Sequence, residues 1–168
     1  VALGLHRKQT DDELRQLAGD AVYRRVRVLN HSSLSEDCVR VGTTSLGTPV
    51  EINRIVAEAD LLIATGNVEP HALAGISGGV KALMPGVASH RSIESNHSLS
   101  LSYKATPGQA DNPIHRDLEE ARQFVPIHFL FNVVVDHERR LIAAASGHPV
   151  EAHRHLAHVA AKTFVLPA

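Results

Sequence analysis

Apolar positions along the chain occur in short runs separated by longer periodic stretches, a pattern typical of strands alternating with helices. Strand-like runs occur at residues 26–29, 39–43, 61–64, 129–135 and 141–145. The run at 61–64 is apolar throughout, which predicts a buried strand of a parallel sheet. The last two runs are joined by a charged segment at 136–140 and predict a β-hairpin near the C-terminus.

Helix signals lie between these runs. Thr10 and Glu13 have capping-box spacing and predict a helix over 11–20. Asn112-Pro113 predicts a helix from 113 to about 124, and His148-Pro149 predicts a final helix to about 164. Shorter helical stretches are expected at 54–59, 80–84 and 92–99, the last capped by Ser92, with an irregular segment at 103–112. Together the elements predict a single α/β domain over residues 1–168, layered, with a mostly parallel sheet and flanking helices.

Composition excludes several classes of protein. The 168 residues are 43% apolar and 21% charged, typical of one globular domain, and no apolar run approaches the ~20 residues of a membrane-spanning helix. The net charge of −1 does not favour a nucleic-acid partner. A single cysteine, Cys38, excludes an intramolecular disulfide and indicates a reducing compartment such as the cytoplasm. The chain begins without Met or a signal peptide, so we expect it to be part of a longer protein.

The segment 66–97 carries the clearest chemical signal. His71 follows the strand predicted at 61–64, where the carboxyl ends of strands in open α/β sheets bind ligands. Gly75, Gly78 and Gly79 would allow the backbone to approach a ligand closely. The loop is not a P-loop, because Lys81 is not flanked as that motif requires, and ATP chemistry is therefore disfavoured.

Lys81 and His97 each have a structural and a functional interpretation. Lys81 could be a solvated residue in a first helical turn, or a desolvated amine whose lowered pKa suits covalent attachment to a cofactor carbonyl. His97, considered alone, could be a capping or core-edge histidine as well as a metal ligand.

The same segment resembles the signature of the nickel-dependent lactate racemase family. Four blocks occur in the family's order: Glu69-Pro70-His71, Ala74 to Lys81, Pro85-Gly86-Val87-Ala88 and Asn96-His97. Further similar blocks lie at 3–7, 42–50, 132–134 and 147–150, so that the resemblance covers essentially the whole chain. Two positions near His6 depart from the family pattern, with Leu5 where Thr is common and Lys8 where Pro is frequent.

The resemblance implies a racemase or epimerase of 2-hydroxy acids such as lactate. Its cofactor would be nickel in a nickel-pincer nucleotide, pyridinium-3-thioamide-5-thiocarboxylic acid mononucleotide. By matching position, Lys81 would hold the cofactor as a thioamide, and His97 would complete the nickel coordination. His6 and His71 would be the two acid/base residues. The glycine-rich loop would line the cofactor through four residues: Gly75, Ser77, Gly78 and Gly79.

The implied mechanism is a reversible hydride transfer with one histidine for each enantiomer. A neutral imidazole removes the hydroxyl proton of the substrate while the Cα hydride moves to the cofactor, and return of the hydride to the other face inverts the centre. An unperturbed imidazole pKa near 6.5 suits both proton acceptance and donation at neutral pH. A single protein imidazole suffices because the other nickel donors are soft sulfur and carbon atoms of the cofactor.

The resemblance also implies that other parts of the enzyme lie elsewhere. The family's upstream Arg-Pro segment, which holds the cofactor phosphate, and its substrate-binding second domain have no counterpart in these 168 residues. We therefore expect part of the cofactor-bearing N-terminal domain of a longer two-domain protein, inactive by itself. Expected partners are a small 2-hydroxy acid and the cofactor-biosynthesis enzymes, and an exposed former interface would favour association between copies of the chain.

Two other functions remain open from the residues alone. One is a non-enzymatic module that binds a small molecule or a partner, and the other is a divalent-metal hydrolase using His6, His71 and His97. The retention of both Lys81 and His97 favours the racemase. Cys38 is expected to be unreactive. The remaining histidines are interpreted as surface or capping residues: His31, His90, His115, His128, His137, His148, His153, His155 and His158.

Overall fold

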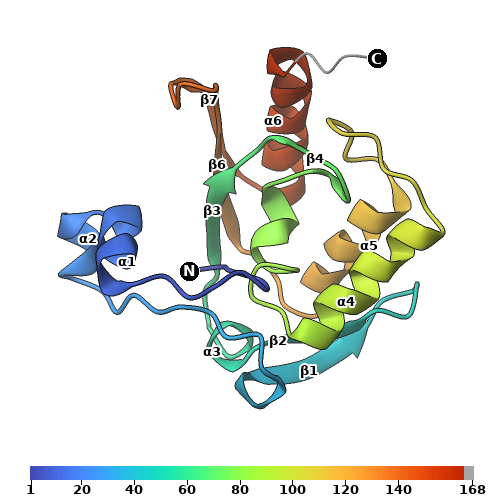
Figure 1. Cartoon of the computed structure of the whole chain (residues 1–168), viewed down its shortest axis with the longest axis horizontal. Helices are drawn as coiled ribbons and strands as arrows, with labels where there is room; N and C mark the ends of the chain where they lie inside the picture. The colour runs from blue at the N-terminus through green and yellow to red at the C-terminus, as the bar shows by residue number, and fades with distance from the viewer. Residues whose placement is uncertain (165–168) are drawn as a thin grey trace.

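The computed structural model describes residues 1–164 and has a mixed α/β architecture (Figure 1). Its helices are α1 (Asp11–Ala18), α2 (Asp20–Tyr23), α3 (Arg54–Ala57), α4 (His90–Ser98), α5 (Pro113–Glu120) and α6 (Pro149–Thr163). Its strands are β1 (Cys38–Thr43), β2 (Pro49–Asn53), β3 (Ile63–Asn67), β4 (Pro70–His71), β5 (Gly75–Ile76), β6 (Phe129–Val135) and β7 (Leu141–Gly147). Four short 3₁₀ helices are η1 (Ser35–Asp37), η2 (Gly79–Ala82), η3 (Leu99–Leu101) and η4 (Ala121–Gln123). No helix within 1–164 has the length and apolarity needed to cross a bilayer.

The central sheet has the order β3-β6-β7. β3 runs parallel to β6, and β6 pairs with β7 in an antiparallel hairpin. The α/β class, the flanking helices, the parallel strand after residue 61 and the C-terminal hairpin are thereby confirmed. The sheet is mixed rather than mostly parallel, because the short turn between β6 and β7 requires them to be antiparallel.

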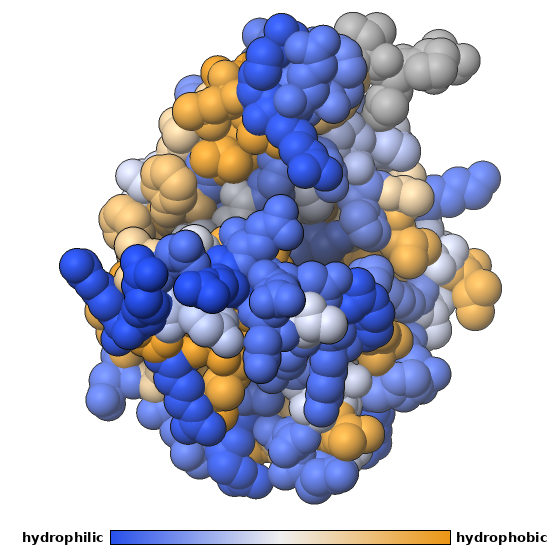
Figure 2. Space-filling view, turned by 60° about the vertical axis from the view of Figure 1, so that its left-hand side comes forward, coloured by the Kyte–Doolittle hydropathy of each residue, from blue (hydrophilic) through white to orange (hydrophobic). Residues whose placement is uncertain are grey.

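The two faces of this sheet differ in burial. α6 packs against β6 and β7, and it covers the face that carries Leu130 and Val134. On the other face Ile63, Phe129 and Phe131 remain 54%, 42% and 46% exposed. Figure 2 shows apolar side chains at the surface on the side of the molecule that includes the sheet. The prediction that the strand at 61–64 is buried on both faces is therefore wrong, and this face of the sheet presents an apolar surface.

A separate two-stranded ribbon is formed by β1 and β2. The strand expected at 39–43 is confirmed as β1, whereas β2 occupies a segment that the sequence pattern did not assign as a strand. Residues 26–29 form no strand, although the carbonyl oxygen of Leu29 accepts a hydrogen bond from the amino group of Val1 at 2.5 Å. Local β propensity without a partner strand does not suffice to form a ladder.

Two of the predicted helices, α1 and α5, begin directly after their predicted capping residues, and α4 does not. Thr10 forms the capping box of α1, and Gly19, with φ of 77°, ends this helix after Ala18. Asn112 caps α5, while α4 begins one turn earlier than expected, because Ser89 rather than Ser92 is its N-cap. The helix predicted to extend to about 164 is α6.

The hydrophobic core lies on both sides of the glycine-rich loop. One cluster joins β2, η2 and α4 through residues that include Ile52, Leu83, Met84 and Ile93. A second cluster joins β6 and α6 through Val134, Leu156 and Ala160, among others. The loop that carries Lys81 is therefore packed between two cores and has a defined position.

Candidate active site

A cleft of about 530 Å³ brings together His6, His71, Lys81 and His97. The four residues come from the N-terminal turn, β4, η2 and the last turn of α4, and up to 91 positions separate them in the sequence. Apolar side chains complete the lining, including Leu3, Leu73 and Ile93. Four residues singled out for catalysis, cofactor attachment and metal binding therefore share one concave surface, as a binding site requires.

Lys81 lies in η2, directly after the glycine-rich turn. Gly78 has φ of 77°, and its carbonyl oxygen accepts the Lys81 N–H at 3.1 Å, which starts the 3₁₀ turn. Burial lowers the pKa of the Lys81 amine to about 8, and the charge of Glu69 opposes this change. A large fraction of the amine is therefore neutral near pH 8 and able to act as a nucleophile.

His71 is held by the tight β4–β5 hairpin, in which it pairs with Gly75. Its Nδ1 atom accepts hydrogen bonds from the backbone N–H groups of Leu73 and Ala74, both at 3.2 Å. The neutral ring consequently carries its hydrogen on Nε2. Burial, and then the neighbouring Lys81 charge, lower the pKa of His71 to about 4. The sequence argument assumed that His71 titrates near neutral pH. In this structure it does not, because the surroundings disfavour its charged form.

His97 lines the cleft, and its neighbour Asn96 is anchored on an adjacent face of α4. The Asn96 side chain is buried and donates to Asp117 Oδ2 at 2.8 Å and to the carbonyl oxygen of Ile114 at 3.3 Å. Burial, followed by the Lys81 charge, lowers the pKa of His97. This lowering favours the neutral imidazole, the form that can bind a metal ion.

His6 reaches the rim of the cleft from the N-terminal turn. The N–H of Gly4 donates to the carbonyl oxygen of Gly86, and the N–H of His6 donates to that of Leu3, both at 2.9 Å. The first contact joins the His6 block of the sequence directly to the Pro85-Gly86 block. His6 itself remains exposed.

The glycine-rich loop lies outside the lining of this cleft. The loop residues concerned are Gly75, Ser77, Gly78 and Gly79. A Cβ atom on Gly75 would lie 1.9 Å from the Gln109 carbonyl oxygen, and one on Gly79 would lie 2.6 Å from Cγ of His153. In this structure their missing side chains allow close packing against the protein itself, which sets the position of Lys81.

Ser77 and Gly79 also fasten the loop to the sheet. The Ser77 hydroxyl accepts from the N–H of Glu69 at 2.9 Å and donates to the carbonyl oxygen of Asn67 at 3.2 Å. The N–H of Gly79 donates to Asn132 Oδ1 at 2.8 Å. The loop is therefore held by strand residues of both β3 and β6.

Sequence reasoning missed Asp117, which links the site to the β1–β2 ribbon. Its side chain is fully buried and accepts hydrogen bonds from the hydroxyl groups of Thr44 and Thr48, in addition to the bond from Asn96. A signal was available, because Asp117 follows Ile114 at helical spacing and precedes Leu118, so it falls on the apolar face of α5.

Three histidines interpreted as surface residues are buried instead: His31, His115 and His153. His31 donates from Nε2 to the carbonyl oxygen of Ala88 at 2.9 Å, and burial lowers its pKa. His153 shares the apolar face of α6 with Leu156 and Ala160, a helical spacing that could have revealed its burial. Cys38 is buried too, which raises its thiol pKa to about 11.

The family described as "Lactate racemase N-terminal domain" matches residues 1–108, more than half of the chain. A lactate racemase of Thermoanaerobacterium thermosaccharolyticum is 39% identical over 157 residues, which are 91% of this chain and 37% of that protein. A lactate racemase of Lactiplantibacillus plantarum is 37% identical over 158 residues, 92% of this chain and 37% of that protein. The chain thus spans less than two-fifths of the length of these curated relatives.

Solved structures agree with the sequence comparison. The lactate racemase apoprotein from Thermoanaerobacterium thermosaccharolyticum superposes with a TM-score of 0.90 and 36% identity, covering 96% of this chain and 40% of that one. A protein from Thermotoga maritima superposes with a TM-score of 0.77 at 23% identity, covering 96% and 44%, and shows the shared fold alone. Together with the match over residues 1–108, these similarities show that the chain belongs to the lactate racemase N-terminal domain family.

Proposed function

We propose that this chain is the cofactor-bearing part of a racemase or epimerase of 2-hydroxy acids, in which a nickel-pincer nucleotide is attached to Lys81. The observation that carries the proposal is the meeting of Lys81, His97, His71 and His6 in one cleft of a lactate racemase family chain. Because the chain spans 37% of the length of its relatives, the substrate and the activity of the whole protein are part of the proposal.

The residues of the cleft fit the proposed cofactor chemically. The amine of Lys81, with its pKa near 8, is nucleophilic enough at mildly alkaline pH to form an amide or thioamide bond. The imidazole of His97 would supply one nitrogen ligand, a donor that suits nickel(II). When bound, the cofactor would supply the hydride acceptor that the protein's own side chains lack.

Proton transfer is assigned to His6 and His71. In this structure neutral His71 carries its hydrogen on Nε2, because backbone N–H groups occupy Nδ1, so it can donate a hydrogen bond to a substrate oxygen. Accepting a proton at Nε2 would require it to release these two contacts. His6 also lines the cleft and is exposed, and no backbone hydrogen bond to its ring occurs within residues 1–164.

We also propose that this chain is one part of a two-domain protein and that it does not racemise substrate by itself. The exposed sheet face around Phe129 and Phe131 would then be covered by another part of the protein or by a second copy of the chain. The proposed partners are a small 2-hydroxy acid and the enzymes that make the cofactor, without nucleic acid or membrane, in the cytoplasm.

The alternative of a divalent-metal hydrolase loses support from the geometry. Within residues 1–164, three metal-ligating side chains lie close together at His115, Glu119 and His153, whereas the cleft histidines His6, His71 and His97 form no such cluster. A zinc hydrolase needs such a cluster to hold its metal and an activated water. A pure binding module would bind its ligand tightly without metal, which the following experiment distinguishes from the racemase.

The proposal is tested by intact mass spectrometry and metal analysis of the chain co-produced with cofactor-making enzymes and nickel. We expect a mass increase that maps to the peptide containing Lys81, together with one equivalent of nickel. Lys81→Ala should abolish the adduct, because no other group of the cleft can form the covalent bond. His97→Ala should lose nickel and keep the organic adduct, because it removes only a metal ligand.

Lys104→Ala is the matched control, since Lys104 is an exposed lysine outside this cleft. This variant should acquire the cofactor adduct and nickel to the same extent as the chain without substitutions. An adduct that persists in Lys81→Ala would refute the assignment of the tether, and an unmodified mass without nickel would favour the binding module.

A further inference from the structure

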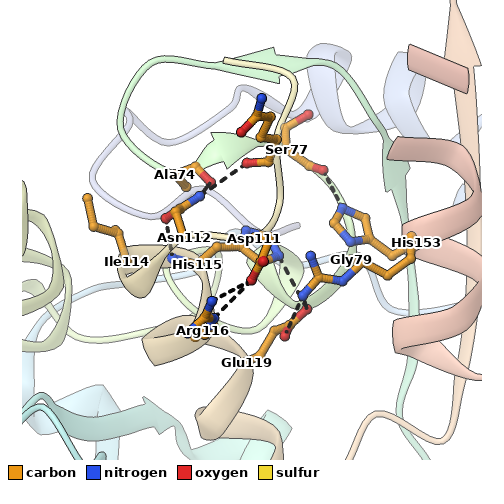
Figure 3. A network of polar contacts seen from close by, with 12 residues as sticks. Ala74, Ser77, Gly79, Asp111, Asn112, Ile114, His115, Arg116, Glu119 and His153 are labelled. Carbon is orange, nitrogen blue, oxygen red and sulfur yellow. Dashed lines mark hydrogen bonds and ion pairs between the residues drawn. The ribbon is translucent and has the colours of Figure 1, made fainter. Parts of the chain in front are cut away.

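We propose that His115, Glu119 and His153 form a second metal site, for a divalent transition-metal ion of the Zn²⁺ type, beneath the loop that carries Lys81. One ligand atom from each residue lies within 4.8 Å of the other two. Figure 3 shows the three side chains in one polar network with Ser77 and Gly79. The proposal concerns residues outside the cleft and does not depend on the racemase assignment.

His115 provides the first argument for a missing ligand. Its side chain is 0% exposed, and neither ring nitrogen makes a hydrogen bond within the described structure. Nε2 lies 3.4 Å from Oε1 of Glu119, close enough for both atoms to approach a common ion. Buried polar atoms in folded proteins are nearly always paired, whereas within residues 1–164 Nδ1 has no hydrogen-bond partner and Nε2 has only this long contact with Glu119, so the imidazole has room for a further partner.

His153 has the orientation expected of a metal-binding histidine. Its Nε2 atom donates to the carbonyl oxygen of Ser77 at 2.8 Å, which leaves Nδ1 as the nitrogen that carries the lone pair. Histidine ligands typically donate their other ring N–H to a carbonyl or carboxylate in this way.

Glu119 completes a donor set of two imidazoles and one carboxylate. It lies one turn after His115 on α5, and both its oxygens accept from Nη2 of Arg154, at 3.0 and 2.9 Å. Such a hydrogen bond orients a ligating carboxylate, and one lone pair on each oxygen remains available. Two histidines and a carboxylate, with a fourth position for water, are a zinc donor set.

Metal binding at this position requires the three side chains to close on the ion and one imidazole ring to turn. The His115 and His153 rings are stacked, with centroids 5.3 Å apart and planes inclined by 7°, so their lone pairs lie in nearly parallel planes and converge on one ion only after a ring turns. Zinc–nitrogen bonds of about 2.0–2.1 Å would draw the ligand atoms together by roughly 1–1.5 Å. Rotation of the Glu119 and His115 side chains on the same helix can provide this movement.

A metal ion in this position would join α5, α6 and the glycine-rich loop. His153 bonds to Ser77 and packs directly against Gly79, where a Cβ atom would lie 2.6 Å from its ring. Lys81 follows two residues later. The proposed ion would therefore stabilise the loop from the side opposite the cleft.

The test is a titration of the metal-free chain with Zn²⁺ in competition with a chromophoric chelator, followed by metal analysis. We expect tight uptake of one equivalent at this site. Glu119→Gln should weaken it by more than about 100-fold, because loss of even an outer-shell partner costs about 10- to 100-fold in metal affinity. His90→Ala is the matched control, because His90 and Glu94 form an exposed His–Glu pair of the same spacing on α4.

A second control tests whether the cleft histidines contribute to zinc uptake. Uptake should persist in the double variant His71→Ala/His97→Ala, which removes the candidate nickel ligand and its neighbour. Zinc uptake that is absent in the unmodified chain, unaffected by Glu119→Gln or lost in the double variant would overturn the proposal. Failure of cofactor loading would not affect this result, because the titration uses Zn²⁺ alone.

A measurement on the chain without substitutions tests the site even if Glu119→Gln fails to fold. In the ¹⁵N-labelled unmodified chain, Zn²⁺ should shift the ring nitrogen resonances of His115 and His153, with Nδ1 of His153 changing most. Resonances of exposed His155 and His158 should remain in place. Shifts confined to the exposed histidines would show surface binding and contradict the site.

Discussion

Lys81 is expected to reach half of its maximal reactivity toward an acylating reagent at about pH 8 in the chain without cofactor. The physical reason is burial, which disfavours the ammonium form and lowers the pKa of the amine to about 8 from the usual 10.5. At pH 8 the neutral fraction of Lys81 should be about 150-fold larger than that of an ordinary lysine. The measurement is competitive acylation with a trace reagent between pH 6 and 11, with the modified peptides quantified by mass spectrometry.

The chain contains its own controls, since its other three lysines are exposed: Lys8, Lys104 and Lys162. They report the reactivity of exposed lysines in the same samples. Equal midpoints for all four lysines would contradict the proposed environment of Lys81. The acylated protein offers a second readout, because removal of the Lys81 charge should raise the pKa of His71, which that charge helps to lower.

Asp117→Ala is expected to lower the free energy of unfolding by about 4 kcal/mol. The substitution would leave the Thr44 and Thr48 hydroxyls and the Asn96 amide without their common acceptor in the interior. Each buried donor left unpaired costs about 1–3 kcal/mol. Urea unfolding at pH 7, followed by circular dichroism, measures the change.

Two variants calibrate this prediction. Asp111→Ala removes an exposed carboxylate of the neighbouring segment, which pairs with Arg116, and should change stability far less than Asp117→Ala does, because solvent screens exposed ion pairs. Asp117→Asn keeps the size of the side chain and should be the milder change at this position. A loss in Asp117→Ala no greater than that in Asp111→Ala would show that the network does not hold α4 and the β1–β2 ribbon together.

The functional consequence of the Asp117 network concerns His97. Asn96 and His97 are adjacent, and the bond from Asn96 to Asp117 turns the helix so that His97 lines the cleft. The Asn-His block therefore combines a buried anchor with a side chain directed to the site. This division of roles could not be inferred from the two letters alone, because either residue could have faced the cleft.

Burial on the sheet and helices was the least predictable feature. The run at 61–64 is apolar at every position, yet Ile63 is exposed while Ala64 is buried. His115 and His153 have polar side chains, yet both lie in the interior. In each case burial depends on which element packs against the residue, and this is decided by contacts between segments far apart in the chain.

The amino-acid sequence by itself determined the α/β class, the capped helices, the C-terminal hairpin and the chemical types available between His71 and His97. These features depend on local periodicity, turn residues and short spacings, which the chain expresses within a few residues. Only the tertiary structure decided that His6 joins His71, Lys81 and His97 in one cleft, and that the loop glycines pack against Gln109 and His153 instead of lining it. The physical reason is that desolvation, hydrogen-bond pairing and close packing are properties of neighbours in space, which the order of residues does not specify locally.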